Sequence, residues 1–234
     1  KEEYLKAALK ADYKMEKANM LADGVNSSSE ALAGNDALAS HETCDIADYT
    51  WTIGYYLMAT GDGQWADRIE KAMFNAAFGA ITKDFKSMQY FSCPNQFIAT
   101  GNSNHNGFKY GLTWMAYRPI HETECCIGNL HRYMPNYVAR MWMKDKKGQP
   151  VAALYGPSSV EYTLPDGTVV KIEEQTNYPF EEKIDFIFRF YKDGKEVNGK
   201  QAMDFTYRIP GWCTKEEAGF KTVSKEWTSG EVFS

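Results

Sequence analysis

Hydrophobic positions in the first part of the chain recur with helical spacing. From Tyr4 to about Leu21, apolar residues three or four positions apart alternate with lysines and glutamates, which predicts an amphipathic helix. A second helix is predicted from Glu42 to Ala59 and a third from Gln64 to about Ile81, separated by the stop signal Thr60 to Gly63. Two helices joined by so short a turn form an antiparallel hairpin.

Less regular segments surround these helices. The polar stretch from Asp23 to His41 is rich in Gly, Ser and Asn and predicts a long loop with Glu30 in its middle. Loops of this length inside a compact domain are often functional. Loops and short strands are expected from Lys83 to Pro119. A fourth helix is predicted from about Ile127 to Met143, kinked or interrupted by Pro135.

The pattern changes at residues 145–150, beyond which short apolar runs predict strands. In the run Ile184–Phe190 the apolar side chains point one way, while Asp185 and Arg189 point the other. This alternation favours an antiparallel sheet with one buried face and, most simply, a β-sandwich. The predicted strands are Val151–Tyr155, Val160–Leu164, Val169–Glu173, Ile184–Phe190 and Phe205–Ile209. We therefore predict an α + β protein with a helical domain at 1–146 and a sheet domain at 147–234.

Composition narrows the classes of partner. The chain has 234 residues and a net charge of -5, without any run of lysine or arginine, so nucleic acid is not an expected partner. No apolar run approaches the ~20 residues that a membrane-spanning helix needs, and no membrane partner is predicted. The chain does not begin with Met, so the lack of a signal segment leaves both the bacterial cytoplasm and the periplasm open.

The five cysteines do not suit a disulfide framework. Their number is odd, and a mutual disulfide between the adjacent Cys125 and Cys126 would be strained. Glu42 and Cys44 begin one predicted helix and the Cys pair begins another. Three thiols and a carboxylate suit tetrahedral zinc, and the spacing lacks the Cys-x-x-Cys knuckle of a structural finger. The alternative is that these are small buried side chains.

A thiol at a helix N-terminus beside a dication would have its pKa lowered by both the helix dipole and the metal, and would be nucleophilic at neutral pH. His41 and His121 each precede a glutamate and are interpreted either as partners of the metal ligands or as partly exposed loop residues. Tyr90 either lines the pocket or packs in the core. Cys93 and Cys213 are interpreted as structural thiols.

Several short motifs follow one another along the chain in a specific order and spacing. They are Glu42-Thr43-Cys44, Thr60-Gly61-Asp62, Ala66-Asp67, Ile69-Glu70, Asn75-Ala76, Glu124-Cys125-Cys126-Ile127-Gly128-Asn129, Arg132, Tyr155-Gly156 and Arg208-Ile209-Pro210-Gly211-Trp212. Together they resemble the β-L-arabinofuranosidases of glycoside hydrolase family 127, and the resemblance runs from about Leu5 to the C-terminus. Ile127-Gly128 stands where many members have two prolines, which indicates a distinct subgroup.

This resemblance implies a partial (α/α) six-hairpin toroid followed by an antiparallel β-sandwich. About four helices are too few for a full toroid, so we expect a C-terminal part of a longer enzyme. The resemblance also implies a zinc ion held by Glu42, Cys44, Cys125 and Cys126, with Cys125 as nucleophile and Glu30 as general acid/base. The implied activity is retaining hydrolysis of an arabinose-containing or related oligosaccharide, and a homodimer stays open.

Two other functions remain at this point. The chain could be a non-catalytic carbohydrate-binding or structural protein in which the same residues hold a structural zinc. It could also be a cysteine hydrolase in which Cys125 is the nucleophile and His131 the base.

Overall fold

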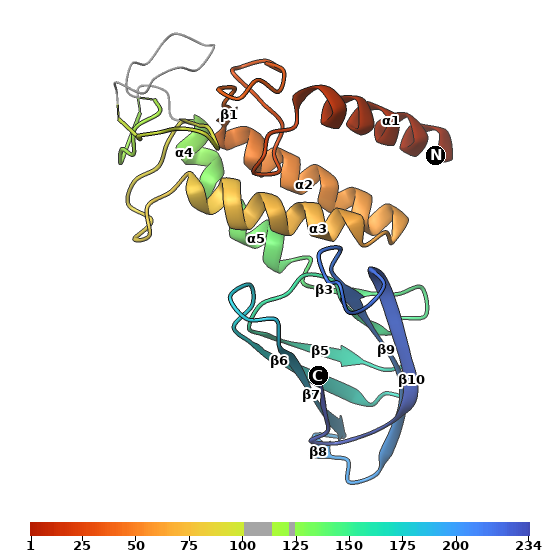
Figure 1. The fold of residues 1–234 in the computed structure, drawn as a ribbon. Coiled ribbons are helices and arrows are strands. Elements are labelled where there is room, and N and C mark those ends of the chain that lie inside the picture. The colour runs from red at the N-terminus through yellow and green to blue at the C-terminus, as the bar shows by residue number, and fades with distance from the viewer. Residues whose placement is uncertain (101–113, 122–124) are drawn as a thin grey trace. The chain divides into compact units, whose positions relative to one another are not determined.

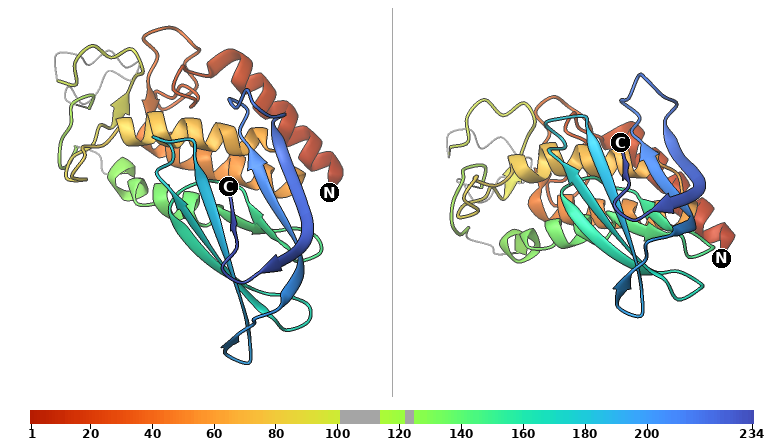
Figure 2. Two further views of the ribbon diagram at one scale, coloured as in Figure 1. Left: turned by 60° about the horizontal axis from the view of Figure 1, so that its bottom comes forward. Right: turned by 90° about the horizontal axis from the view of Figure 1, so that it is seen from below.

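The structure, a computed structural model, describes residues 1–100, 114–121 and 125–234. Internal contacts divide it into a helical unit, residues 1–61 with 65–137, and a sheet unit, residues 62–64 with 138–234. Figures 1 and 2 show the helices in the first unit and the main sheets in the second. The protein is therefore a mixed α + β chain, helical first and then built of sheets, while the proposed domain boundary at 146/147 stays a prediction.

The helical unit contains the three long helices that the sequence predicts. They are α1 (Glu2–Asn19), α2 (Thr43–Thr60) and α3 (Gln64–Lys71), and α3 runs on as the π-helical segment η1 (Ala72–Ala77). Gly61 ends α2 with a φ of 67°, a left-handed conformation that favours glycine, and its N–H bonds to the Leu57 carbonyl. No helix among the described residues is long and apolar enough to cross a membrane.

The predicted loop after α1 leads into a small antiparallel sheet. β1 (His41–Glu42) pairs with β2 (Phe91–Ser92), with His41 opposite Ser92 and Glu42 opposite Phe91. Because opposed residues share a face, Glu42 and Phe91 lie on one side of this sheet and His41 and Ser92 on the other. Part of the segment predicted as loops and short strands, residues 101–113, lies outside the described residues.

The fourth helix differs from its prediction. It begins at Cys125 and consists of two short helices, α4 (Cys125–Leu130) and α5 (Tyr133–Val138), with the break at residues 131–132. Pro135 is the third residue of α5, in the first turn, where a helix loses no hydrogen bond to a missing N–H. The break nevertheless lies three to four positions before Pro135, where a proline ring would clash with the carbonyl of residue 131 in a continuous helix, so the predicted interruption is confirmed. The predicted helical extension to Met143 was wrong, because Trp142 starts a strand.

Two sheets form the sheet unit. One has the order β10-β9-β4-β3, and the other has the order β11-β7-β6-β5, with β8 paired to β7. Every pair is antiparallel except β4 with β9, which is parallel, so the prediction of antiparallel sheets is confirmed for the other pairs. The bounds are β3 (Trp142–Lys144), β4 (Pro150–Ala152), β5 (Ser158–Thr163), β6 (Val169–Thr176), β7 (Ile184–Lys192), β8 (Lys195–Glu196), β9 (Lys200–Ile209), β10 (Gly219–Thr228) and β11 (Val232–Phe233).

Aromatic side chains fill the space between these sheets. The alternation predicted for β7 is confirmed, because Phe186, Phe188 and Phe190 are buried while Arg189 is exposed. Phe205 of β9 lies 5.0 Å from Phe186 and 5.1 Å from Phe188 between ring centres. Edge-to-face pairs of this kind add to the free energy gained by burial. The core of the sheet unit is therefore rich in aromatic side chains, although Arg208 and Glu174 are also buried in this unit.

Candidate functional site

Four residues predicted as metal ligands converge in the helical unit. One ligand atom from each of Glu42, Cys44, Cys125 and Cys126 lies within 4.8 Å of all the others. The Cys44 and Cys126 sulfurs are 3.3 Å apart, and the Cys126 sulfur is 3.3 Å from Glu42 Oε1. The Cys125 sulfur is 3.6 Å from the same oxygen. We refer to these four residues as the Glu/Cys cluster.

The local structure explains this convergence. Glu42 ends β1 and caps α2, and Cys44 lies in the first turn of α2. The intervening Thr43 fixes this start, because its N–H donates to the Tyr90 carbonyl at 3.0 Å and its hydroxyl donates to the Gln89 carbonyl at 2.7 Å. The Tyr133 hydroxyl from α5 donates to the Thr43 carbonyl at 3.0 Å. The start of α2 is thereby tied to the segment before β2 and to α5.

The donor set fits a metal ion. Three thiols and one carboxylate are typical zinc donors, and tetrahedral Zn–S bonds of about 2.3 Å place ligand atoms about 3.8 Å apart. The separations in the cluster lie close to that value. Cys126 and Glu42 are buried, whereas Cys125 is exposed. The cluster could therefore hold a metal ion and leave one sulfur accessible from solvent.

The pKa values of the three thiols shift in different directions. The hydrogen bond with Cys126 lowers the pKa of the Cys44 thiol, and Asn129 adds to this effect by donating to the Cys44 sulfur at 3.2 Å. Burial raises the pKa of Cys125 and of Cys126. Protein groups thus lower the pKa of Cys44 and raise the pKa of the other two thiols, and a bound dication would supply positive charge that favours deprotonation of all three.

Asn129 is itself held in place. Its side-chain oxygen accepts a hydrogen bond from Arg132 at 2.8 Å, and Arg132 pairs with Asp48 of α2 at 2.6 Å. Its amide nitrogen also donates to the Cys125 carbonyl at 3.1 Å. The amide is therefore oriented with its N–H groups toward the cluster, which explains its hydrogen bond to sulfur.

Tyr90 connects the predicted acid/base residue to the predicted nucleophile. Its hydroxyl donates to Glu30 Oε1 at 2.9 Å and lies 3.0 Å from the Cys125 sulfur. The ring is buried and stacks on Trp114 with a centroid distance of 4.2 Å. Burial raises the pKa of Tyr90, so the phenol remains a donor. Tyr90 is thus both a core residue and a site residue, where the sequence left these as alternatives.

Glu30 has an uncommon backbone conformation. Its φ is 66°, in the left-handed region that few residues other than glycine, asparagine and aspartate adopt. Strain of this kind concentrates at functional sites, where surrounding contacts maintain it. Two such contacts lie directly beside it, since Ser29 N–H bonds to the Ala31 carbonyl and Tyr90 bonds to the Glu30 carboxylate.

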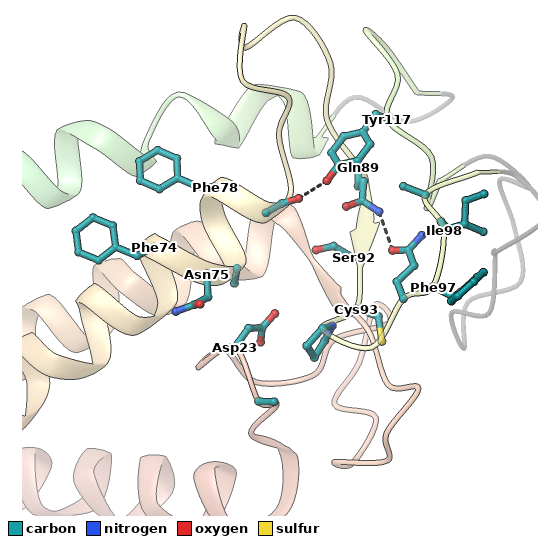
Figure 3. A pocket seen from close by; sticks show the side chains of 16 residues that line it. Asp23, Phe74, Asn75, Phe78, Gln89, Ser92, Cys93, Phe97, Ile98 and Tyr117 are labelled. Carbon is teal, nitrogen blue, oxygen red and sulfur yellow. Dashed lines mark hydrogen bonds between the residues drawn. The ribbon is translucent and has the colours of Figure 1, made fainter. Parts of the chain in front are cut away.

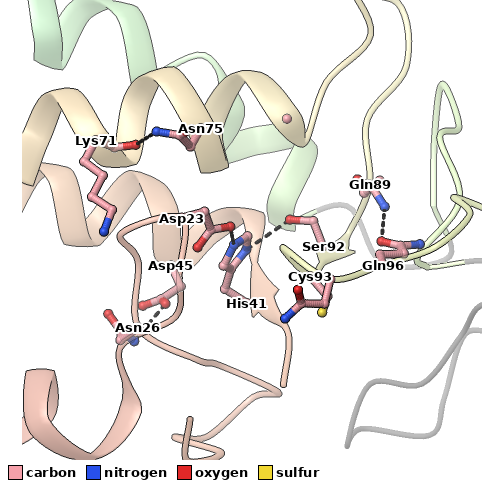
Figure 4. Close-up of polar contacts among 12 residues, drawn as sticks. Asp23, Asn26, His41, Asp45, Lys71, Asn75, Gln89, Ser92, Cys93 and Gln96 are labelled. Atoms are coloured by element: carbon pink, nitrogen blue, oxygen red, sulfur yellow. Dashed lines mark hydrogen bonds and ion pairs between the residues drawn. The ribbon is translucent and has the colours of Figure 1, made fainter. Parts of the chain in front are cut away.

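The histidines of the two motifs are buried, so the prediction of partly exposed loop residues was wrong. His41 lies between Asp23 Oδ2, 2.6 Å from its Nε2, and Ser92 Oγ, 3.0 Å from its Nδ1 (Figure 4). His121 Nε2 lies 2.8 Å from the Met88 carbonyl oxygen. His41 therefore braces β1 one residue before Glu42.

His131 lies in a different environment. It is exposed and lines a small cavity together with apolar residues that include Ile127 and Met134. Within the described part of the chain, the groups hydrogen-bonded to the Cys125 sulfur are the Tyr90 hydroxyl and the Glu42 carboxylate. The geometry therefore offers no support for His131 as the base of a cysteine hydrolase.

A cavity of about 710 Å³ is lined by Asp23 and Ser92, the two hydrogen-bond partners of His41 (Figure 3). Phe74 and Phe78 line it from one side, and Gln89 and Ser92 line it from the segment around β2. None of the four Glu/Cys cluster residues lines it. Since Ser92 and Glu42 lie on opposite faces of the β1–β2 sheet, this cavity is separate from the cluster.

Comparison with family models gives two matches. A model described as "Beta-L-arabinofuranosidase, GH127 catalytic domain" matches residues 1–139. A second, described as "Beta-L-arabinofuranosidase, GH127 middle domain", matches residues 151–225. A search of curated proteins finds no match.

Solved structures of similar fold extend over most of the chain. A GH127 β-L-arabinofuranosidase from Geobacillus stearothermophilus T6 aligns with a TM-score of 0.71 and 20% identity over 92% of this chain and 35% of its own. A structure described as "Glycoside hydrolase" aligns with a TM-score of 0.71 and 18% identity over 92% of this chain and 39% of its own. A GH127 β-arabinofuranosidase aligns with a TM-score of 0.69 and 17% identity over 92% of this chain and 36% of its own. The chain thus spans little more than a third of the length of these structures.

Proposed function

Because the chain belongs to the GH127 β-L-arabinofuranosidase family, we propose that it contributes the metal-binding and catalytic residues of a retaining glycoside hydrolase acting on arabinose-containing carbohydrates. The observation that carries this proposal is the Tyr90 hydroxyl, which is hydrogen-bonded to Glu30 and lies 3.0 Å from the Cys125 sulfur. A carboxyl group and an accessible thiol on either side of one phenol form a compact acid and nucleophile pair.

In this proposal Glu42, Cys44, Cys125 and Cys126 hold zinc. The donor types and their separations support it. When bound, zinc would supply the positive charge that keeps the Cys125 sulfur deprotonated at neutral pH. The remaining chemistry belongs to side chains of this chain.

Cys125 is the nucleophile in this scheme. Its sulfur forms a bond to the anomeric carbon while the bond to the leaving oxygen breaks, and Glu30 gives its proton to that oxygen. Glu30 then takes a proton from water, whose oxygen displaces the sulfur and restores the thiolate. Two displacements return the original configuration at carbon. The exposure of Cys125 supports this role, because substrate must reach the sulfur.

The spacing of the pair is compatible with retention. Glu30 Oε1 and the Cys125 sulfur each lie one hydrogen-bond length from the Tyr90 oxygen. Retaining enzymes with two carboxylates hold them about 5 to 5.5 Å apart, close enough for direct attack and too close for an intervening water. Tyr90 in this scheme positions Glu30 beside the Cys125 sulfur.

The proposal extends to architecture. We assign the helical unit to part of an (α/α) six-hairpin toroid and the sheet unit to a β-sandwich, with domains 1–146 and 147–234. The similarity to the GH127 structures and the aromatic layer between the two sheets support this assignment.

The alternative is a non-catalytic protein in which the cluster holds a structural metal. Structural zinc sites are closed, with all ligands shielded. The exposed Cys125 and the adjacent Glu30 favour the catalytic function over this alternative.

The first experiment measures metal content by mass spectrometry in the wild type and in Cys126→Ser. We expect about one zinc per chain in the wild type and a large loss in the variant, because Cys126 is one of four candidate ligands. Cys213→Ser is the control, since Cys213 lies outside the cluster and is a free thiol. Equal zinc in all three proteins would contradict the ligand assignment.

The second experiment measures hydrolysis of a β-L-arabinofuranoside. We expect Cys125→Ser to lose at least about 10³-fold in kcat, because a nucleophile is removed. Glu30→Gln should be slow on substrates with poor leaving groups and much less affected with an activated aryl leaving group, which needs no protonation. Full activity of Cys125→Ser would remove Cys125 as nucleophile.

A further inference from the structure

A second candidate binding site lies within the sheet unit. A cavity of about 400 Å³, in the size range of small-molecule sites, opens among residues of the 155–234 segment. Aromatic side chains form a large part of its wall. The aromatic side chains are Tyr155, Tyr178, Phe186, Tyr207, Trp212 and Phe233. We name it the Trp212 cavity.

Trp212 is held in place with half of its surface open. Its side chain is 53% exposed, whereas Tyr178 beside it is buried. The two rings are nearly parallel, with a centroid distance of 6.3 Å and an angle of 20°. Tyr178 in turn packs edge-on against Tyr155. A supported indole with an open face is a preformed platform that loses little conformational entropy on binding.

The charged groups at the edge of this cavity are paired. Lys215 lies 3.0 Å from Glu182. Glu216 lies 2.6 Å from Lys221. Because each charge is already compensated, the edge has little net attraction for an anion or a cation, yet it presents hydrogen-bond donors and acceptors.

A buried cationic group, Arg208, also lines the cavity. Its Nε donates to the Ala153 carbonyl at 2.7 Å, and its guanidinium lies 5.1 Å from the centre of the Tyr155 ring. These contacts hold the guanidinium against the Ala153 carbonyl and the Tyr155 ring. With paired charges at its edge and aromatic rings in its wall, the cavity favours a ligand that is neutral, rich in hydroxyl groups and able to present an apolar face.

We propose that the Trp212 cavity is a non-catalytic subsite for a neutral oligosaccharide. The C–H groups on one face of a sugar ring pack against the negatively charged face of the indole. Hydroxyls at the ring edge exchange hydrogen bonds with Glu182, Lys215 and Glu216. The identity of the sugar as arabinose-containing rests on the proposed function. The subsite would hold a chain of the substrate class independently of the Glu/Cys cluster.

The test is calorimetric titration of a neutral arabinofuranosyl oligosaccharide into the whole 234-residue chain carrying Cys125→Ser, which prevents turnover. We expect Trp212→Ala in that background to weaken binding at the sheet unit at least tenfold and to reduce the stoichiometry by one. Phe180→Ala is the matched control, because Phe180 is 92% exposed in the same unit and does not line the cavity. It should bind like its parent.

Stoichiometry separates this proposal from the proposed function. If the Cys125→Ser parent binds two oligosaccharides and the Trp212→Ala variant binds one, both the subsite and the proposed function are supported. If the parent binds one and the variant binds none, the subsite is supported, but the candidate catalytic site does not bind the oligosaccharide. Binding unaffected by Trp212→Ala overturns the subsite. Tighter binding of an oligogalacturonide, an anionic chain, than of the neutral oligosaccharide also overturns it. If Trp212→Ala does not fold, Trp212→Phe keeps a smaller ring and should weaken binding two- to fivefold.

Discussion

Among the described residues, the helical unit buries more polar and charged side chains than the sheet unit does. The helical unit buries polar and charged groups that bond to one another across the sequence, including Asp12 with Arg68 and His41 with Asp23. The sheet unit buries rings such as Phe188, Phe205 and Trp227, all fully inaccessible. Polar groups can be held inside a protein only when their partners are fixed, so the helical unit is built for specific placement.

This difference has an energetic consequence. Apolar burial tolerates changes of pH and depends mainly on the volume and shape of the side chains. Buried charges and hydrogen bonds fail sharply when one partner is removed, because the other is left uncompensated. We therefore expect truncation of a ring to weaken the sheet unit most, and removal of a charge or a proton to weaken the helical unit most.

The largest effect is expected for Phe205→Ala. Phe205 is fully buried, and its ring contacts Phe186, Phe188 and Trp227. Its truncation should lower the free energy of unfolding by about 3 to 5 kcal/mol. Urea denaturation followed by tryptophan fluorescence measures this loss, with the exposed Phe180→Ala as control. A loss below about 1 kcal/mol would show that the aromatic layer does not dominate the stability of the sheet unit.

In the helical unit, Asp12→Ala should cost about 3 kcal/mol. Arg68 Nη1 donates to Asp12 Oδ2 at 2.8 Å, and the two side chains are only 16% and 5% exposed. Removing Asp12 leaves a largely buried guanidinium without its carboxylate. Glu16→Ala is the matched control, because Glu16 is half exposed and lies 3.8 Å from the same guanidinium. Equal losses in the two variants by chemical denaturation would mean that burial does not set the value of this pair.

Tyr49 adds a pH dependence to the same network. Its oxygen accepts hydrogen bonds from Arg68 at 2.7 and 3.0 Å, and burial raises its pKa to about 12. Between about pH 10 and 12 the unfolded tyrosine loses its proton while the folded one keeps it, so stability falls as the pH rises.

Tyr49→Phe tests this by removing the ionisable group. From pH 9 to pH 12 the wild type should lose about 2 kcal/mol of unfolding free energy relative to the Tyr49→Phe variant. Tyr13→Phe, which replaces an exposed tyrosine in the same unit, should keep the pH dependence of the wild type. Parallel stability curves for wild type and Tyr49→Phe would rule out Tyr49 as the source.

Periodicity predicted most of the regular structure, and its failures have physical causes. β10 was missed because only Trp227 is fully buried along it, so no alternation marks it in the sequence. The π-helical turn at Ala72–Ala77 also leaves no trace, since its apolar residues fit a helical pattern equally well.

The Glu/Cys cluster could be predicted because its residue types are uncommon and stand at helix starts. The connection made by Tyr90 could not, because an aromatic residue is expected in a core and this one also lies in the core. Its hydroxyl reaches Glu30, sixty positions earlier in the chain, only through the fold. Tertiary contacts of this kind leave no local signal in the sequence.

The smallest effect is expected for an exposed ion pair of the sheet unit, Lys200 with Glu226, whose charged atoms are 3.4 Å apart and whose side chains are 68% and 62% exposed. Water screens both charges, and ordering the two side chains costs conformational entropy. Lys200→Ala should therefore change the free energy of unfolding by less than about 0.5 kcal/mol.

A double-mutant cycle with Glu226→Ala isolates the pair from other effects of the Lys200 side chain, such as packing of its methylenes on the sheet. The coupling should be close to zero and should vanish at high salt. A coupling as large as that between Asp12 and Arg68 would mean that exposed charges stabilise this protein as much as buried ones. The contrast between the two units would then lie in residue composition and not in how each is held together.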